Sequence, residues 1–184
     1  MKKIVISSAL YLFGSAFCTA QDITPAPADK AVVYFVRPSS FGFAINFSYF
    51  DSARLIGKFN GTGYIRYECD PGTHLFWARS ENKDFVEADV EAGKIYFLEA
   101  IPQMGGIKAG VRLAPVDPKS QKKMEKLLKF LNKKSPESFT PEQLEEEQKK
   151  MDDVIKRGLE KYLQEKEAGN KVERLERTMY YGSQ

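Results

Sequence analysis

"YECDPGTHLFWARSEN", residues 67–82, contains the only histidine and the only tryptophan of this 184-residue chain. Its centre is "DPGT", residues 70–73. Proline presets φ at the second position of a turn, and glycine accepts the positive φ that the third position of a type II turn requires. The stretch therefore predicts two strands joined by a tight turn, with Cys69 before the turn and His74 after it.

Two strand patterns follow this turn. Along residues 74–79, alternation places Phe76 on one face of a strand and Trp77 on the other. Residues 85–93, "FVEADVEAG", also alternate, with apolar side chains on the inward face. The outward positions are all acidic: Glu87, Asp89 and Glu91. We interpret them as a solvated strand face, with carboxylate chemistry or weak calcium binding as the alternative that their spacing leaves open.

Strand and turn signals recur over residues 31–117. "AVVYFVRP", residues 31–38, is a continuous apolar run closed by proline, which is typical of a central strand buried on both faces. Asn60-Gly61 separates two strand-like runs and predicts a hairpin, because both central residues of a type I′ turn need positive φ. We expect an all-β sandwich of about seven or eight antiparallel strands.

The composition changes near Pro118, and we expect an α-helical extension over residues 118–184. From Lys119 to Lys134 the chain holds seven lysines, one acid and an apolar stripe at helical spacing. "TPEQ", residues 140–143, starts a second helix with a capping threonine and proline at the first position. Residues 172–179 predict a short third helix.

The apolar stripes of these helices need a cover. The sandwich, a neighbouring helix, a partner chain or an anionic membrane surface could each provide it. Opposite charges favour antiparallel packing of the first two helices on each other. Because composition and period both change near Pro118, residues 31–117 are also expected to fold alone.

The first twenty residues have the pattern of a secretory signal peptide, in which two lysines precede an uncharged run that ends in small residues at Ala20. This run is shorter than the roughly 20 residues of a membrane-spanning helix. Cys18 offers an alternative, the lipid-modified cysteine of a bacterial lipoprotein, but bulky Phe17 precedes it. We expect cleavage after Ala20, export to the periplasm or beyond, and a flexible leader over residues 21–30.

Loss of the signal segment lowers the net charge from +3 to about +1, which leaves no overall positive field for nucleic acid. Cys69 is then the only cysteine, so an intramolecular disulfide is excluded. Cys69 is interpreted either as a buried thiol or as an exposed thiol that pairs with another chain.

"VVYFVRP", "IGKFNGTGYIRYECDPGTHLFWA" and "VEAGKIYFLEA" follow one another in this chain. Their succession resembles the bacterial family catalogued as domain of unknown function 2846, a group of secreted and lipoprotein β-domains. The resemblance covers about residues 30–115, and "PGTH" followed by "AGKIYFL" is its most specific part. It implies an extracytoplasmic bacterial protein with a compact all-β domain. It implies no catalytic residue, because the family has no established activity.

The chemistry-bearing residues favour a non-enzymatic role. One histidine cannot build a multi-histidine metal site, and both Cys-x-x-Cys and Gly-x-Ser-x-Gly are absent. We predict no catalytic residue, no metal and no cofactor. A Cys69–His74 nucleophile pair is the one catalytic arrangement that the pattern leaves open. A hydrolase of envelope material is the alternative function.

Aromatic residues carry the binding prediction. "SSFGFAINFSYF", residues 39–50, holds five aromatic rings, which suit either a sandwich core or a surface that binds a sugar or a peptide. The candidate binding residues are Phe41, Phe43 and Tyr49. We expect a non-catalytic, envelope-associated module that binds an unknown envelope protein or glycan, with weak membrane-surface contact through the lysine-rich helix and no nucleic acid.

Overall fold

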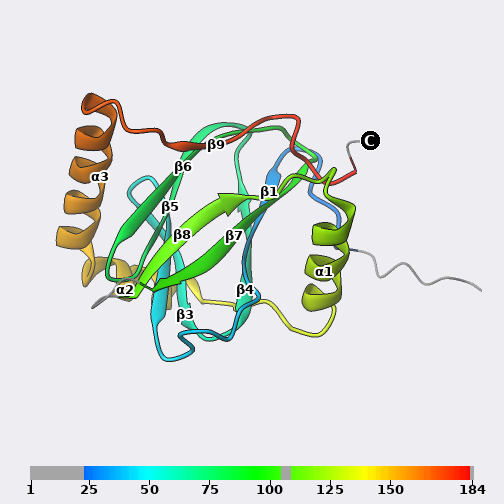
Figure 1. Ribbon diagram of the computed structural model, residues 1–184, viewed down its shortest axis with the longest axis horizontal. Coiled ribbons are helices and arrows are strands. Elements are labelled where there is room, and N and C mark those ends of the chain that lie inside the picture. Colours follow the sequence, from blue (N-terminus) through cyan, green and yellow to red (C-terminus); the bar gives the residue numbers. More distant parts are fainter. Residues whose placement is uncertain (1–22, 105–108, 183–184) are drawn as a thin grey trace, which may run out of the picture.

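The computed structural model describes residues 23–104 and 109–182, which form two packed β-sheets with helices against their outer faces (Figure 1). One sheet has the strand order β4-β1-β7-β8 and the other β3-β2-β5-β6-β9. The strands are β1 (Ala31–Arg37), β2 (Asn46–Asp51), β3 (Arg54–Asn60), β4 (Gly63–Cys69), β5 (Gly72–Arg79), β6 (Lys83–Val90), β7 (Ile95–Met104), β8 (Ala109–Pro115) and β9 (Glu173–Leu175). The helices are α1 (Gln121–Leu131), α2 (Pro141–Lys149) and α3 (Asp152–Glu167). The predicted β-sandwich with a helical C-terminal extension is confirmed.

The connections between strands differ from those predicted. β1 pairs in parallel with β7, and β6 with β9, so both sheets are mixed rather than purely antiparallel. Asn60-Gly61 joins β3 to β4, which lie in different sheets, so the predicted hairpin there is wrong. The turn before Gly72 likewise carries the chain from one sheet to the other. Positive φ at Gly61 and Gly72 is a local requirement, and it does not specify which strand the next one pairs with.

The strand faces follow the predicted alternation. All seven residues of β1 are buried, as its continuous apolar run predicts. Phe35 faces the core between the sheets, whereas Tyr34 faces the cluster under α1. On β5, Phe76 faces the inner core and Trp77 packs with Ile155 of α3. Both sheets therefore have an apolar outer face as well as an apolar inner one.

The helices cover these outer faces. Met124, Leu127 and Leu131 of α1 are buried against the four-stranded sheet. α3 lies against the five-stranded sheet, where a Cβ added to Gly158 would come within 2.6 Å of the Trp77 ring. Figure 1 shows α1 and α3 on opposite sides of the molecule, with α2 next to α3. The predicted packing of the first two helices on each other is thus wrong, because each sheet needs its own cover.

The segment after α3 completes the second sheet, so the predicted third helix is wrong. β9 extends this sheet beyond β6. The outward acids of β6 form ion pairs with the C-terminal extension. Glu87 pairs with Lys166 at 2.6 Å, and Asp89 pairs with Arg177 at 2.9 Å. The acidic strand face is therefore a contact surface for the C-terminal extension, and only partly a solvated one.

Side chains and connecting segments close the sides of the sandwich. Asn82 bonds both backbone groups of Val111 on β8, at 2.6 Å and 2.9 Å. On the opposite side, the segment between α1 and α2 crosses β3. Phe139 of this segment packs so closely on Gly57 that a Cβ added to Gly57 would come within 2.5 Å of the Phe139 ring. Residues 23–30 lie along the first sheet, with Ile23 packed against the cluster under α1, so this part of the expected leader is held by the fold.

Candidate functional site: an aromatic loop anchored by a buried arginine

The loop of residues 38–45, between β1 and β2, presents two of the predicted binding residues. Phe41 is 49% exposed and Phe43 is 72% exposed. Gly42, between them, has a φ of 64°, and the Ile45 N–H donates to the Gly42 carbonyl at 2.9 Å. The loop is therefore an ordered turn with two large apolar side chains in solvent. We call it the aromatic loop.

Arg37, the last residue of β1, holds this loop from inside the protein. Its side chain is fully buried, and its two Nη atoms donate to the carbonyl oxygens of Ile45 and Gly42, each at 2.7 Å. Its guanidinium carbon lies 3.9 Å from the centre of the Phe47 ring. Burial lowers the pKa of the guanidinium. No carboxylate within the described ranges pairs with Arg37, so loop carbonyls and an aromatic face compensate its charge.

Tyr49, the third predicted binding residue, does not lie with the other two. It is fully buried, and its ring stacks on Phe59 at 5.3 Å between centres. Burial raises the pKa of its hydroxyl. Alternation along β2 directs Tyr49 into the space between the sheets, so it cannot contact a ligand at the surface. Arg37 was missed in its place, although an arginine closing a wholly apolar run was a signal that the sequence offered.

A polar cluster around His74 lies at the opposite end of β2. The Nδ1 of His74 is 2.8 Å from Asp51 Oδ2, and the Nε2 of His74 is 2.8 Å from the carbonyl oxygen of Asp70. The Tyr67 hydroxyl donates to the same Asp51 oxygen at 3.0 Å. The hydrogen bond to Asp51 is the largest cause that raises the pKa of His74 to about 10, against the opposing effect of burial. At neutral pH the ring is protonated and donates through both nitrogens.

This arrangement bears on the Cys69–His74 pair. A protonated imidazole whose two N–H groups are bonded to oxygen has no lone pair with which to accept a proton from a thiol. Cys69 itself is 5% exposed. The geometry therefore gives the pair no general base at neutral pH, and the cluster ties the start of β5 to the end of β2.

We expect the free energy of unfolding to depend on His74 in a defined pH window. The pKa is about 10 in the folded protein and 6.5 for the free group, so the folded state binds more protons between these values. The contribution is complete below about pH 6.5 and is lost as the pH rises towards 10. His74→Gln should cost about 1–3 kcal/mol at pH 6 and much less near pH 10, as measured by urea unfolding.

Asp70→Asn is the matched control, because Asp70 contacts the ring through its backbone oxygen. It should keep the pH dependence of the natural chain, whereas Asp51→Asn should weaken it. Equal slopes of stability against pH in the natural chain and in His74→Gln would contradict the assignment.

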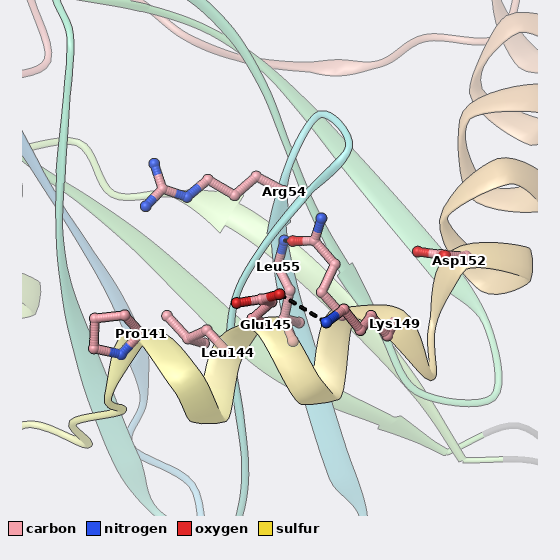
Figure 2. Close-up of a pocket in the computed structure, with 8 residues that line it drawn as sticks. Arg54, Leu55, Pro141, Leu144, Glu145, Lys149 and Asp152 are labelled. Atoms are coloured by element: carbon pink, nitrogen blue, oxygen red, sulfur yellow. Dashed lines mark hydrogen bonds and ion pairs between the residues drawn. The ribbon is translucent and has the colours of Figure 1, made fainter.

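Two surface hollows of about 330 and 390 Å³ lie beside β3, and both are lined by Arg54 and Leu55. In the smaller one, Lys149 pairs with Glu145 at 2.7 Å, and the Gln148 side chain accepts the Leu55 N–H at 3.0 Å. Figure 2 shows the Arg54 side chain extending away from Lys149 rather than towards it. The polar groups bond each other or diverge, so this hollow gathers no set of reactive groups.

Two findings concern only residues 23–104 and 109–182. They contain no cluster of three or more histidine, cysteine, aspartate and glutamate side chains that suits a metal ion. None of their helices combines the length and the apolar character that crossing a bilayer requires.

Searches with this chain against models of known protein families, curated proteins and solved structures find no match. The resemblance of residues 30–115 to domain of unknown function 2846 therefore stays a prediction.

Proposed function

We propose that this chain is an exported, non-catalytic binding module of the bacterial envelope, and that Phe41 and Phe43 contact its partner. One observation carries the proposal: two large apolar side chains stand in solvent on a loop that a fully buried arginine holds in place. Burying a guanidinium and exposing two phenyl rings both cost free energy. The exposed rings do not serve the core, so a role outside the fold accounts for them best.

The remaining parts of the proposal rest on the sequence. The signal pattern of residues 1–20 and the alternative anchor Cys18 lie outside the described residues. A hydrolase has no observation in its favour in the described part of the chain, because the His74 ring is bonded at both nitrogens and the groups around Arg54 do not converge. We therefore propose the binding function alone.

Site-specific photo-crosslinking in the native envelope tests this function. A benzophenone analogue of phenylalanine at position 43 should form adducts, because that side chain faces the partner. The same analogue at Leu163 of α3, which is 57% exposed, is the matched control and should form few. Phe41→Ser should reduce the adducts from position 43 while changing stability by no more than about 0.5 kcal/mol. Equal yields from positions 43 and 163 would contradict the proposal.

A further inference from the structure

The aromatic loop and the turn beside it between β3 and β4 carry no charged residue of their own, and the carboxylate of Glu137 lies beside that turn, 3.0 Å from where a Cβ on Gly63 would be. Residues 38–46 and 59–63 contain no aspartate, glutamate, lysine or arginine. These two segments are neighbours, since the Phe43 carbonyl oxygen lies 3.8 Å from where a Cβ on Gly61 would be. Two uncharged segments with exposed rings can enter the interface of a bilayer without dehydrating a charge of their own.

A third exposed apolar side chain lies at the same end. β7 runs parallel to β1, so the carboxyl ends of both strands point the same way. β7 ends at Met104, which is 75% exposed. Both strands run towards the lower side of the view in Figure 1, where the carboxyl end of α1 also lies. One end of the molecule therefore gathers Phe41, Phe43 and Met104.

α1 runs in the same direction as β1, which brings its last turn to this end. Gln121, at the start of α1, lines a hollow together with Tyr181. The Tyr181 N–H donates to the carbonyl oxygen of Ile95, which lies opposite the start of β1. After the end of α1, the Lys134 carbonyl accepts the hydroxyl of Tyr64, which lies opposite the end of β1. The carboxyl end of α1 therefore lies at the end of the sandwich where β1 leads into the aromatic loop.

This end of α1 carries uncompensated positive charge. α1 buries its apolar side chains in the sheet and leaves lysines exposed. Among the seven lysines from Lys119 to Lys134, Lys123 alone has an ion pair within the described residues, at 2.9 Å from Glu99. The exposed lysines at this end of α1 are Lys129, Lys133 and Lys134.

We propose that the aromatic loop and the carboxyl end of α1 bind an anionic lipid bilayer, with Phe41 and Phe43 in the interface and Lys133 and Lys134 among the headgroups. This rests on the proposed function and names the partner of that loop. Lysines alone would suit any polyanion. The phenyl rings favour lipid, because they offer no hydrogen-bonding group to a phosphate polymer and gain free energy on leaving water.

Vesicle co-sedimentation tests the inference with the chain from Gln21 onwards, because the apolar run before it would itself bind lipid. The protein should bind vesicles of phosphatidylglycerol mixed with phosphatidylcholine, more weakly at high salt, and hardly bind phosphatidylcholine alone. Phe41→Ser with Phe43→Ser should weaken binding about tenfold or more. Lys133→Gln with Lys134→Gln should also weaken it about tenfold.

Two controls match these variants. Lys119→Gln with Lys122→Gln removes the same charge at the other end of α1. That end is about 16 Å away, beyond the Debye length of about 8 Å at physiological salt, so binding should stay close to that of the natural chain. Leu163→Ser removes an exposed apolar side chain from α3 and should have no effect.

Three outcomes would overturn the inference. The two pairs of lysine substitutions could weaken vesicle binding equally, Phe41→Ser with Phe43→Ser could leave vesicle binding unchanged, or the protein could bind zwitterionic vesicles as strongly as anionic ones. The photo-crosslinks from position 43 test the lipid inference and the proposed function separately. Lipid adducts support both. Protein or glycan adducts without vesicle binding leave the binding function standing and remove the lipid. Absence of any adduct from position 43 overturns the function itself.

Discussion

The chain from residue 21 to 118 should fail to fold on its own, contrary to the expectation that its composition and periodicity raise. Without the later residues, only Ile23, Ala26 and Val116 remain against Tyr34 and Phe97 on the outer face of one sheet. No helix covers Phe50, Leu55 and Trp77 on the outer face of the other. A fully buried large apolar side chain contributes about 1.5–3 kcal/mol. A whole domain is ordinarily stable by only about 5–15 kcal/mol. Uncovering about five such side chains is therefore enough to remove that stability.

Thermal melting and size-exclusion chromatography measure this result. Residues 119–184 supplied as a separate chain should restore a cooperative melt, since the lost contacts are non-covalent. A chain ending at residue 170 keeps all three helices and loses β9, so it should fold with reduced stability. A fragment of residues 21–118 that melted cooperatively near the temperature of the full chain would contradict the expectation.

The burial predicted for β1 and β5 was correct, yet the packing predicted for the helices was wrong. Alternation and apolar runs are local properties, so the buried run of β1 and the opposite faces of Phe76 and Trp77 could be predicted. A sheet buried on both faces also requires a layer on each side. Once both sheets are known to be of this kind, the helices have to separate rather than pair. The number of sheets is a non-local property that the pattern did not provide.

The same limit explains the turns and the acidic strand face. Asn60-Gly61 specifies a backbone conformation, but the partner of the next strand depends on segments far away in the chain. Glu87 pairs with Lys166 across 79 positions of sequence, and Asp89 with Arg177 across 88. Alternation alone predicts that these acids point outward, and it cannot show that the last segment of the chain returns to meet them.

The candidate site was predicted in part. Phe41 and Phe43 stand in an uncharged, glycine-containing stretch outside any strand, so their exposure could be inferred from the sequence. Tyr49 belongs to the same aromatic run, and only its place on β2 separates it from them. The place of Arg37 at the close of an apolar run indicated its burial, but its role as the anchor of the loop could not be predicted, because its acceptors are backbone carbonyls, which no side-chain pattern reveals.

Arg37→Met should lower the free energy of unfolding by about 1–3 kcal/mol and loosen the aromatic loop. The substitution leaves the Ile45 carbonyl oxygen without its donor, and an unsatisfied buried group costs about 1–3 kcal/mol. The Gly42 carbonyl oxygen loses Arg37 but keeps the Ile45 N–H as a donor. Removal of a buried charge offsets part of this loss. Urea unfolding measures the stability, and hydrogen exchange at the Ile45 amide reports the loop turn. Arg54→Met, at an exposed arginine without an ion pair in the described residues, should stay within about 0.5 kcal/mol of the natural chain.

Arg37→Lys separates the geometry of the guanidinium from its charge. A single ammonium cannot reach both carbonyls in the forked arrangement, so this variant should also be destabilised. Burial would lower the pKa of the new ammonium below its unfolded value of about 10.4, and the unfolded state would then bind more protons. The variant should therefore gain stability relative to the natural chain as the pH rises towards 10, opposite in sign to the contribution of His74. If Arg37→Met unfolded at the urea concentration of the natural chain and kept the Ile45 amide protected, the loop would not depend on Arg37. The exposed rings would then have no anchor that explains their position.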